Sequence, residues 1–223
     1  MRPMCVSPNG PWAESLRQTL KRVYDPTTRT PVPWLLSGDS ALALQGIYQE
    51  PDLIEFRATS QFAVVYFSQF MRPYELPANR ATVVYRQGGN SAPSDGWRSN
   101  VHQKVVAWSG GGKACWLGRW SVGEFTVQVS FARTIHTDPT ALAVKSGVAR
   151  RVRFEGMDVA VIPLEFLLAE SAQKGDTQLT HRIMHAMRAQ GYSQESLRTA
   201  LDVISSDKAS RLLRLLDLSL VAG

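Results

Sequence analysis

The sequence predicts a mixed α+β fold with helices flanking the sheet and a helical segment at the end, and three observations carry this prediction. Residues 124–132 alternate apolar and polar side chains, as a strand with one buried face does. Other short segments rich in β-branched and aromatic residues occupy the middle of the chain. From Pro163 onward helical periodicity dominates, and strands followed by a run of helices are typical of the α+β class.

Composition and charge describe a globular chain that favours anionic partners. Hydrophobic residues make up 44% and charged residues 20% of the 223 residues, which argues against disorder and against a fibrous repeat. The net charge of +6 is compatible with a nucleotide, a nucleic acid or an acidic protein as partner. Cys5 and Cys115 lie far apart without metal-ligand spacing, so we predict neither a zinc site nor a disulfide framework.

The chain shows no targeting or membrane signal. Residues 1–11 contain no apolar core region of the kind that a secretory signal has, and no stretch of eighteen apolar residues occurs. We therefore expect a cytoplasmic protein without membrane contact, and the sequence leaves the oligomeric state open.

The elements are predicted in order as follows. Residues 1–11 form a leader, residues 12–23 an amphipathic helix, and the prolines of residues 25–33 a loop. Residues 34–56 then read as a short apolar strand, a turn at Ser37–Ser40, a helix ending at Gly46, and a strand that carries Asp52 and Glu55. Further strands are expected at 54–57, 62–67, 82–85, 102–108, 114–120 and 124–132, with a loop at 87–100 and a tight turn at 110–113.

The last third is predicted to be mostly helical. We expect a helix at 141–150, a hairpin of 151–154 with 158–162, and helices at 164–173, 178–189, 194–205 and 207–220. Three regions follow: a leader with the first helix (1–33), an α+β domain (34–162) and a C-terminal helical segment (163–223).

The residues around Gly38 are candidates for binding a phosphate and a metal ion. The N–H groups at the start of the helix after Gly38 would point at an anion, although the same residues also suit a plain helix start with Asp39 or Ser40 as its cap. The candidate metal ligands and catalytic acids are Asp52, Glu55 and Glu124. Asp52 and Glu55 are three residues apart, so a regular strand would place them on opposite faces, and only a bulge would bring them together.

The run Leu36-Ser-Gly-Asp-Ser-Ala-Leu-Ala-Leu-Gln-Gly46, followed by a strand with acids, resembles the opening of the nucleotidyltransferase superfamily with a polymerase-β-like fold. The run 150–169 and the helix with Lys174 are similar to the stand-alone bacterial members of that superfamily, which include toxin and antitoxin components of abortive-infection systems. The resemblance covers roughly residues 34–190 and implies a nucleotidyltransferase-like fold. It further implies Mg²⁺ and a nucleoside triphosphate as cofactors of an active enzyme, with Ser37, Gly38, Ser40 and Lys174 at the nucleotide and Asp52, Glu55 and Glu124 at the metal.

The sequence departs from the family pattern at five positions. Asp39 replaces the second small residue of the phosphate turn, Leu53 and Glu55 stand in the Asp-x-Asp positions, Gln128 falls at the third acid unless Glu124 takes that role, and Glu170 replaces a lysine. Two function classes therefore stay open. The chain is either a divergent nucleotidyltransferase-fold protein that binds a nucleotide or nucleic acid, or a non-catalytic antitoxin- or adaptor-like protein with a degenerate site that binds a partner protein or nucleic acid.

Other residue groups have structural explanations that compete with functional ones. His181 and His185 are four apart on a predicted helix without the glutamate of a zincin motif, which favours an ordinary helix surface. The tryptophans around Gly110 could stack on bases or anchor the core, and the cluster Arg150, Arg151 and Arg153 could meet phosphates or face solvent.

Overall fold

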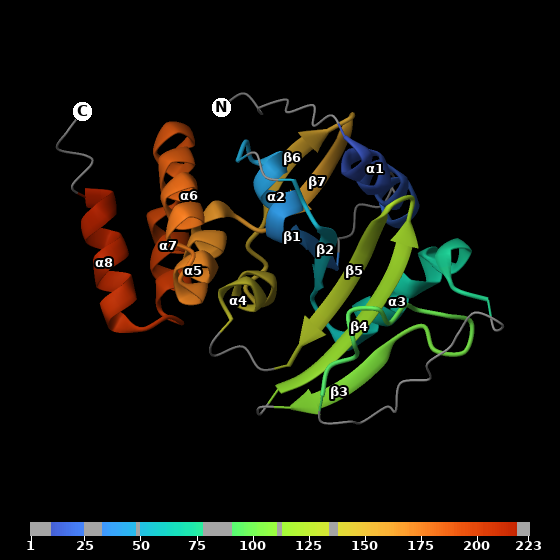
Figure 1. Cartoon of the computed structure of the whole chain (residues 1–223). Helices are drawn as coiled ribbons and strands as arrows, with labels where there is room; N and C mark the ends of the chain where they lie inside the picture. The colour runs from blue at the N-terminus through green and yellow to red at the C-terminus, as the bar shows by residue number, and fades with distance from the viewer. Residues whose placement is uncertain are drawn as a thin grey trace.

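A computed structural model of the protein describes residues 10–24, 33–47, 50–77, 91–110, 113–133 and 138–217. The described part contains one mixed sheet with helices on both faces and a C-terminal group of helices (Figure 1). The elements in chain order are α1 (Pro11–Val23), β1 (Trp34–Ser37), α2 (Gly38–Leu44), β2 (Leu53–Ala58), α3 (Gln61–Phe70), a 3₁₀ turn (Arg72–Tyr74), β3 (Val106–Gly110), β4 (Lys113–Val122), β5 (Phe125–Ala132), α4 (Pro139–Lys145), β6 (Arg150–Phe154), β7 (Met157–Val161), α5 (Leu164–Lys174), α6 (Thr177–Gln190), α7 (Gln194–Leu201) and α8 (Ser206–Asp217). The predicted α+β class, the flanking helices and the C-terminal helical segment are confirmed.

The sheet has the strand order β3-β4-β5-β2-β1-β7-β6. Strands β2 and β5 are parallel neighbours near its middle, whereas β4 pairs with β5 and β1 pairs with β2 in the antiparallel sense. The register places Glu55 of β2 beside Gln128 of β5, which in turn lies beside Arg119 of β4. Three polar side chains from three strands therefore form a row across the sheet.

One face of the sheet carries the aromatic core. Along β2 the side chains of Ile54, Phe56 and Ala58 are buried and alternate with half-buried Leu53, Glu55 and Arg57. The Phe56 ring lies 5.1 Å from that of Phe67 on α3, and Phe67 also contacts the fully buried Trp120 of β4 at 5.9 Å. Because successive strand residues point to opposite faces, Glu55 and Arg57 lie on the face away from α3.

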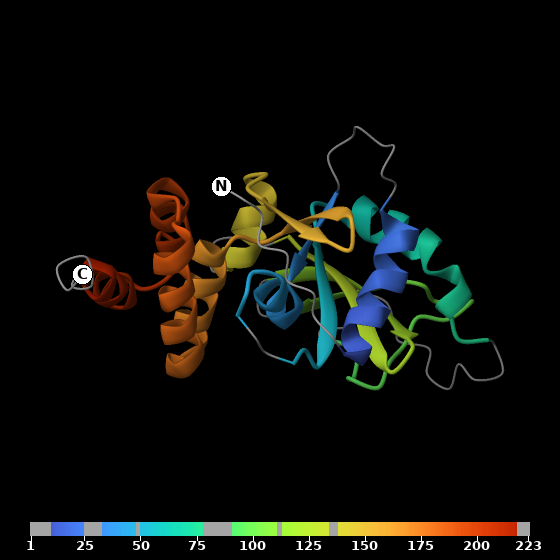
Figure 2. The ribbon, with the colours of Figure 1, turned by 90° about the horizontal axis from the view of Figure 1, so that it is seen from above.

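The two groups of helices lie on opposite sides of the sheet. Figure 2 shows α1 and α3 on one side, and α4 with the C-terminal helices on the other. Helix α5 packs on α6, α7 and α4, and it also contacts α2. The face of β2, β5 and β4 that carries Glu55, Gln128 and Arg119 is therefore on the same side of the sheet as α4 and α5.

One predicted strand is wrong, and another lies outside the described residues. Residues 62–67 belong to the helix α3, which Ser60 caps by accepting a hydrogen bond from Ala63 N at 3.1 Å. The predicted strand 82–85 falls in the range 78–90, outside the described residues. Among the described residues, no helix is both long and apolar enough to cross a membrane.

Candidate functional site

An ion pair between neighbouring strand positions occupies the centre of the open sheet face. Arg57 Nε lies 3.2 Å from Glu55 Oε1, and Arg57 Nη1 donates a hydrogen bond to Ser130 Oγ at 3.3 Å. Arg57 Nε is buried and has no hydrogen-bond partner, so its contact with Glu55 is an ion pair without hydrogen-bond geometry. The guanidinium is therefore held in place while part of its donor capacity stays unused.

Asp138 is a second carboxylate beside Arg57. It caps α4 by accepting hydrogen bonds from Ala141 N at 3.0 Å and from Thr140 Oγ1 at 2.8 Å. Burial acts to raise the pKa of Asp138, but the charge of Arg57 and these hydrogen bonds outweigh it and hold the pKa below its ordinary value. Burial acts to lower the pKa of Arg57, and the neighbouring charges of Glu55 and Asp138 more than offset it, so that pKa is raised.

Arg119 supplies a second guanidinium on the same face. Its Nε donates to Gln128 Oε1 at 2.7 Å, its Nη1 donates to Ser94 O at 3.0 Å, and it lies 3.8 Å from the exposed carboxylate of Asp95. Burial lowers the pKa of Arg119, and the attraction of Asp95 only partly offsets this. The residue in the third acidic position, Gln128, therefore accepts a hydrogen bond from a cation.

Two adjoining clefts open along this face. One of ≈ 200 Å³ is lined by Glu55, Arg57, Ala92, Trp108, Cys115, Leu117, Arg119, Gln128, Ser130, Phe131 and Ala132. The second, of ≈ 140 Å³, shares Arg57 with the first and reaches Lys145 on α4. Trp108 lines the larger cleft, whereas Trp97 and Trp120 are buried and Trp116 packs on Phe131. The clefts thus combine guanidinium groups, hydroxyl and amide groups, and one indole ring.

The predicted acids do not converge in the way a metal site requires. Glu55 is on the open face, Asp52 is exposed just before β2, and Glu124 is exposed in the turn between β4 and β5. No group of three or more His, Cys, Asp or Glu side chains among the described residues could hold a metal ion. The residue aligned with Glu55 across the strands is Gln128, as the family pattern places it, and Glu124 does not take that position.

The turn at Gly38 has a left-handed backbone conformation, and both of its serines are buried. Gly38 has a φ of 59° and an added Cβ would lie 3.3 Å from Glu55 Oε2, so a side chain here would be both strained and crowded. Ser37 is buried, and the buried Ser40 donates to Leu53 O at 3.4 Å. Burial raises the pKa of Asp39, the charge of Asp52 raises it further, and the charge of Lys174 partly offsets these effects.

Lys174 stands near the turn but is already paired. Its Nζ lies 2.9 Å from Glu170 Oε1, one helical turn earlier on α5. Lys174 and Glu170 both act on the pKa of Asp39, lowering and raising it respectively, so the end of α5 approaches the start of α2. The predicted nucleotide ligands Ser37, Gly38, Ser40 and Lys174 are thus near each other, with Asp39 among them.

The functional residues that the sequence reading missed are Arg57, Arg119 and Asp138. Arg57 could have been found because it is two residues after Glu55 on an alternating strand. Arg119 could have been found by predicting a hairpin with its turn at Gly123–Glu124, because the register of that hairpin pairs Arg119 with Gln128. Asp138 carries the Asp-Pro signature of a helix start, but nothing in the sequence places it beside Arg57.

Comparison with solved structures finds similar chains, whereas the two sequence comparisons find none. No protein-family model matches the chain, and no curated protein matches it. A crystal structure from Thermotoga maritima, described as a "putative nucleotidyltransferase", is similar with a TM-score of 0.47 at 16% sequence identity, and the match covers 80% of this chain and 94% of that chain.

Proposed function

We propose that the chain binds a nucleotide, or a nucleotide unit of a nucleic acid, through its phosphate group in the cleft on the open sheet face, without a divalent metal ion. The observation that carries this proposal is the guanidinium of Arg57, fixed 3.2 Å from Glu55 with a buried N–H that has no hydrogen-bond partner. Arginine is well suited to phosphate because its planar fork donates several hydrogen bonds to one oxyanion.

The charges that line the larger cleft favour an anion. Arg57 and Arg119 contribute two positive charges, and Glu55 contributes one negative charge. Ser130 and Gln128 add hydrogen-bonding groups beside them. Trp108 in the wall of the cleft offers an aromatic face on which a base could stack.

The donor set does not fit the Mg²⁺ ion that the sequence resemblance implies. Mg²⁺ prefers carboxylate oxygens in octahedral geometry, but Gln128 supplies an amide and Glu55 already faces a guanidinium. Binding Mg²⁺ at Glu55 would place two cations beside one carboxylate. We therefore propose phosphate binding and no metal-dependent transfer step for this chain.

The sequence resemblance supports the choice of a nucleotide as the ligand, because it implies a nucleoside triphosphate as cofactor. The relation to toxin and antitoxin components of abortive-infection systems stays a prediction, as does the role of a partner protein.

Calorimetry with ATP, CTP, GTP and UTP, each in EDTA and in Mg²⁺, tests the proposal. We expect binding in EDTA, a loss of about tenfold in affinity for Arg57→Gln or Arg119→Gln, and a gain of about threefold for Glu55→Gln. The gain follows because Glu55→Gln removes the negative charge that competes with phosphate for Arg57.

Stronger or weaker nucleotide binding by Glu55→Gln distinguishes phosphate binding by arginine from phosphate binding through a metal ion. A metal site would lose its ligand and bind more weakly, and it would bind only when Mg²⁺ is present. Arg153→Gln, on the exposed edge strand β6, removes the same charge outside the cleft and serves as the matched control. Dependence on Mg²⁺ together with weaker binding by Glu55→Gln, or no heat with any nucleotide, would overturn the proposal.

A further inference from the structure

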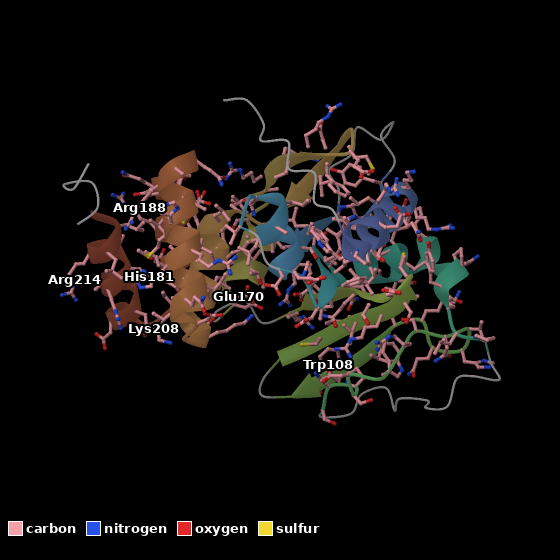
Figure 3. The ribbon with its side chains drawn as sticks, turned by 45° about the horizontal axis from the view of Figure 1, so that its top comes forward. Trp108, Glu170, His181, Arg188, Lys208 and Arg214 are labelled. Atoms are coloured by element: carbon pink, nitrogen blue, oxygen red, sulfur yellow. The ribbon has the colours of Figure 1, made fainter. Side chains whose placement is uncertain are left out.

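The C-terminal helices α6 and α8 present basic side chains on a surface that is separate from the sheet cleft. Figure 3 shows His181, Arg188, Lys208 and Arg214 at the end of the molecule formed by α6 and α8, whereas Trp108 of the cleft lies away from them on the sheet. His181, His185 and Arg188 are exposed on α6, and Lys208, Arg211 and Arg214 are exposed on α8. We call these six residues the α6–α8 basic face.

Carboxylates are scarce on this face. Helix α6 contains no Asp or Glu in its fourteen residues, and α8 has Asp207 and Asp217 only near its two ends. None of the ion pairs between described residues involves a member of the α6–α8 basic face. Elsewhere several basic side chains form ion pairs, for example Arg153 with Asp158, Lys104 with Glu75 and Lys174 with Glu170. Part of the net charge of +6 is therefore concentrated here.

Hydrogen bonds to backbone carbonyls fix two of these cations and leave them charged. Lys208 Nζ donates to Gln173 O at 2.9 Å, and Arg188 Nη2 donates to Leu215 O at 2.9 Å. These bonds tie α8 to the end of α5 and to α6. An Arg has five donors and a Lys three, so both groups keep donors for a ligand.

We propose that the α6–α8 basic face binds single-stranded RNA through its phosphate backbone. Cations that are spread over two helices can contact several phosphates of a nucleic-acid backbone, whereas a single small anion would contact only a few of them. Exposed imidazole rings and guanidinium planes can stack on unpaired bases, which are offered mainly by RNA loops and ends. Leu213, which is 40% exposed between Arg211 and Arg214, adds an apolar contact on the same helix.

Fluorescence anisotropy of a labelled unstructured 16-nucleotide RNA with the full chain, at several salt concentrations, tests the proposal. Arg211→Gln/Arg214→Gln should weaken binding about fivefold or more, because two phosphate contacts are lost. The plot of log affinity against log salt should become less steep by about 1.4, since each contact to a single strand contributes about 0.7. Among the described residues Arg214 donates only to a carbonyl of its own helix, so folding should survive, as thermal unfolding would verify.

The matched control removes the same charge elsewhere. Arg151→Gln/Arg153→Gln changes two exposed arginines of β6 and lowers the net charge equally. We expect it to keep most of the RNA affinity. Equal losses in the two double variants, or no RNA binding by the unaltered chain, would overturn the proposal. Stronger competition by a polyglutamate peptide than by unlabelled RNA would also overturn it and would indicate an acidic protein partner.

The cleft and the α6–α8 basic face are tested separately. Arg119→Gln should weaken mononucleotide binding and should lower the salt dependence of RNA binding by at most about 0.7, the share of one phosphate contact in the cleft. Arg211→Gln/Arg214→Gln should leave mononucleotide binding unchanged and lower that salt dependence by about 1.4. RNA binding that survives when no mononucleotide binds would uphold this inference and reject the proposed function of the cleft.

Discussion

Arg57 and Asp39 show how single residues change the chemistry that the backbone suggests. Gly38 begins α2 with a positive φ of 59°, and Asp39 brings into this turn a carboxylate whose pKa is raised by burial and by Asp52. Arg57 brings a cation to the strand position two residues after Glu55. In this region a carboxylate therefore lies in the turn, and a guanidinium lies on the sheet face beside Glu55.

Asp39→Asn should stabilise the fold at neutral pH. A carboxyl whose pKa is raised by folding costs free energy when it is ionised, and that cost is complete above its folded pKa and absent below its unfolded pKa near 3.8. Asn cannot ionise, so we expect the free energy of unfolding at pH 7 to rise by a few tenths to about 1 kcal/mol. The difference should vanish as the pH falls below about 3.8 in urea unfolding series.

A competing effect would reverse the sign. Asp39 is in the first turn of α2, where a negative charge also interacts favourably with the helix dipole. If Asp39→Asn is less stable at pH 7, the dipole outweighs the repulsion from Asp52 and our account of the turn is wrong.

At the residue scale, the sequence indicated part of the site. Gln128 was predicted at the third acidic position, and the register places it beside Glu55 on the neighbouring strand. The Glu55–Arg57 pair follows from simple alternation and was predictable in principle. The proximity of Asp138 to Arg57 was not, because it depends on how α4 packs against the sheet, which no local pattern encodes.

At the scale of elements, β4 depends on a glycine that lies beneath a tryptophan. Trp120 is fully buried, and a Cβ at Gly118 would lie 2.2 Å from its Cη2 atom. The two residues share one face of β4 because they are two apart. The indole therefore lies flat against the backbone at a position where no side chain fits.

Gly118→Ala should lower the free energy of unfolding by about 1–3 kcal/mol, because overpacking forces either Trp120 or the strand to move. Gly96→Ala is the matched control, since nothing lies within 4 Å of a Cβ there. Guanidinium unfolding monitored by fluorescence would measure both. Equal stabilities of the two variants would show that the core around Trp120 can relax.

The element that sequence reasoning assigned wrongly is α3. Its sequence QFAVVYFSQF is rich in aromatic and β-branched residues, which favours a strand in isolation. The N-cap hydrogen bond of Ser60 and the packing of Phe67 against Phe56 and Trp120 stabilise this segment as a helix. Strands β5, β6 and β7 were predicted well because alternation and a Glu155–Gly156 turn are local signals.

At the scale of the whole molecule, one hydrophobic core joins the sheet and the C-terminal helices. A single cluster of buried residues runs from Trp12 on α1 to Leu216 on α8. The helices after residue 163 therefore share buried residues of one cluster with the sheet. Among the described residues, the C-terminal helices bury apolar side chains against α4, α2 and one another.

Gln45 connects three parts of this core. Its side-chain Nε2 donates to Ala41 O at 3.1 Å and to Ile162 O at 3.0 Å, and its backbone carbonyl accepts a hydrogen bond from Gln190 Nε2 at 2.7 Å. The residue is only 2% exposed, so water cannot replace these partners. Helix α2, the end of β7 and helix α6 therefore depend on one side chain and its backbone.

Gln45→Leu should lower the free energy of unfolding of the whole chain by about 1–3 kcal/mol, because it leaves the carbonyl of Ile162 without that donor.

All six tryptophans precede residue 121, whereas helical circular dichroism at 222 nm also reports α5 to α8. Tryptophan fluorescence and circular dichroism therefore follow different parts of the chain. A shared core predicts that both signals change in one coincident urea transition, and that Gln45→Leu shifts them together. Gln178→Ala, on the exposed side of α6, should shift neither by more than about 0.5 kcal/mol. Loss of the helical signal before the fluorescence signal would instead show that the C-terminal helices unfold as an independent unit, with Gln45 acting only within the sheet domain.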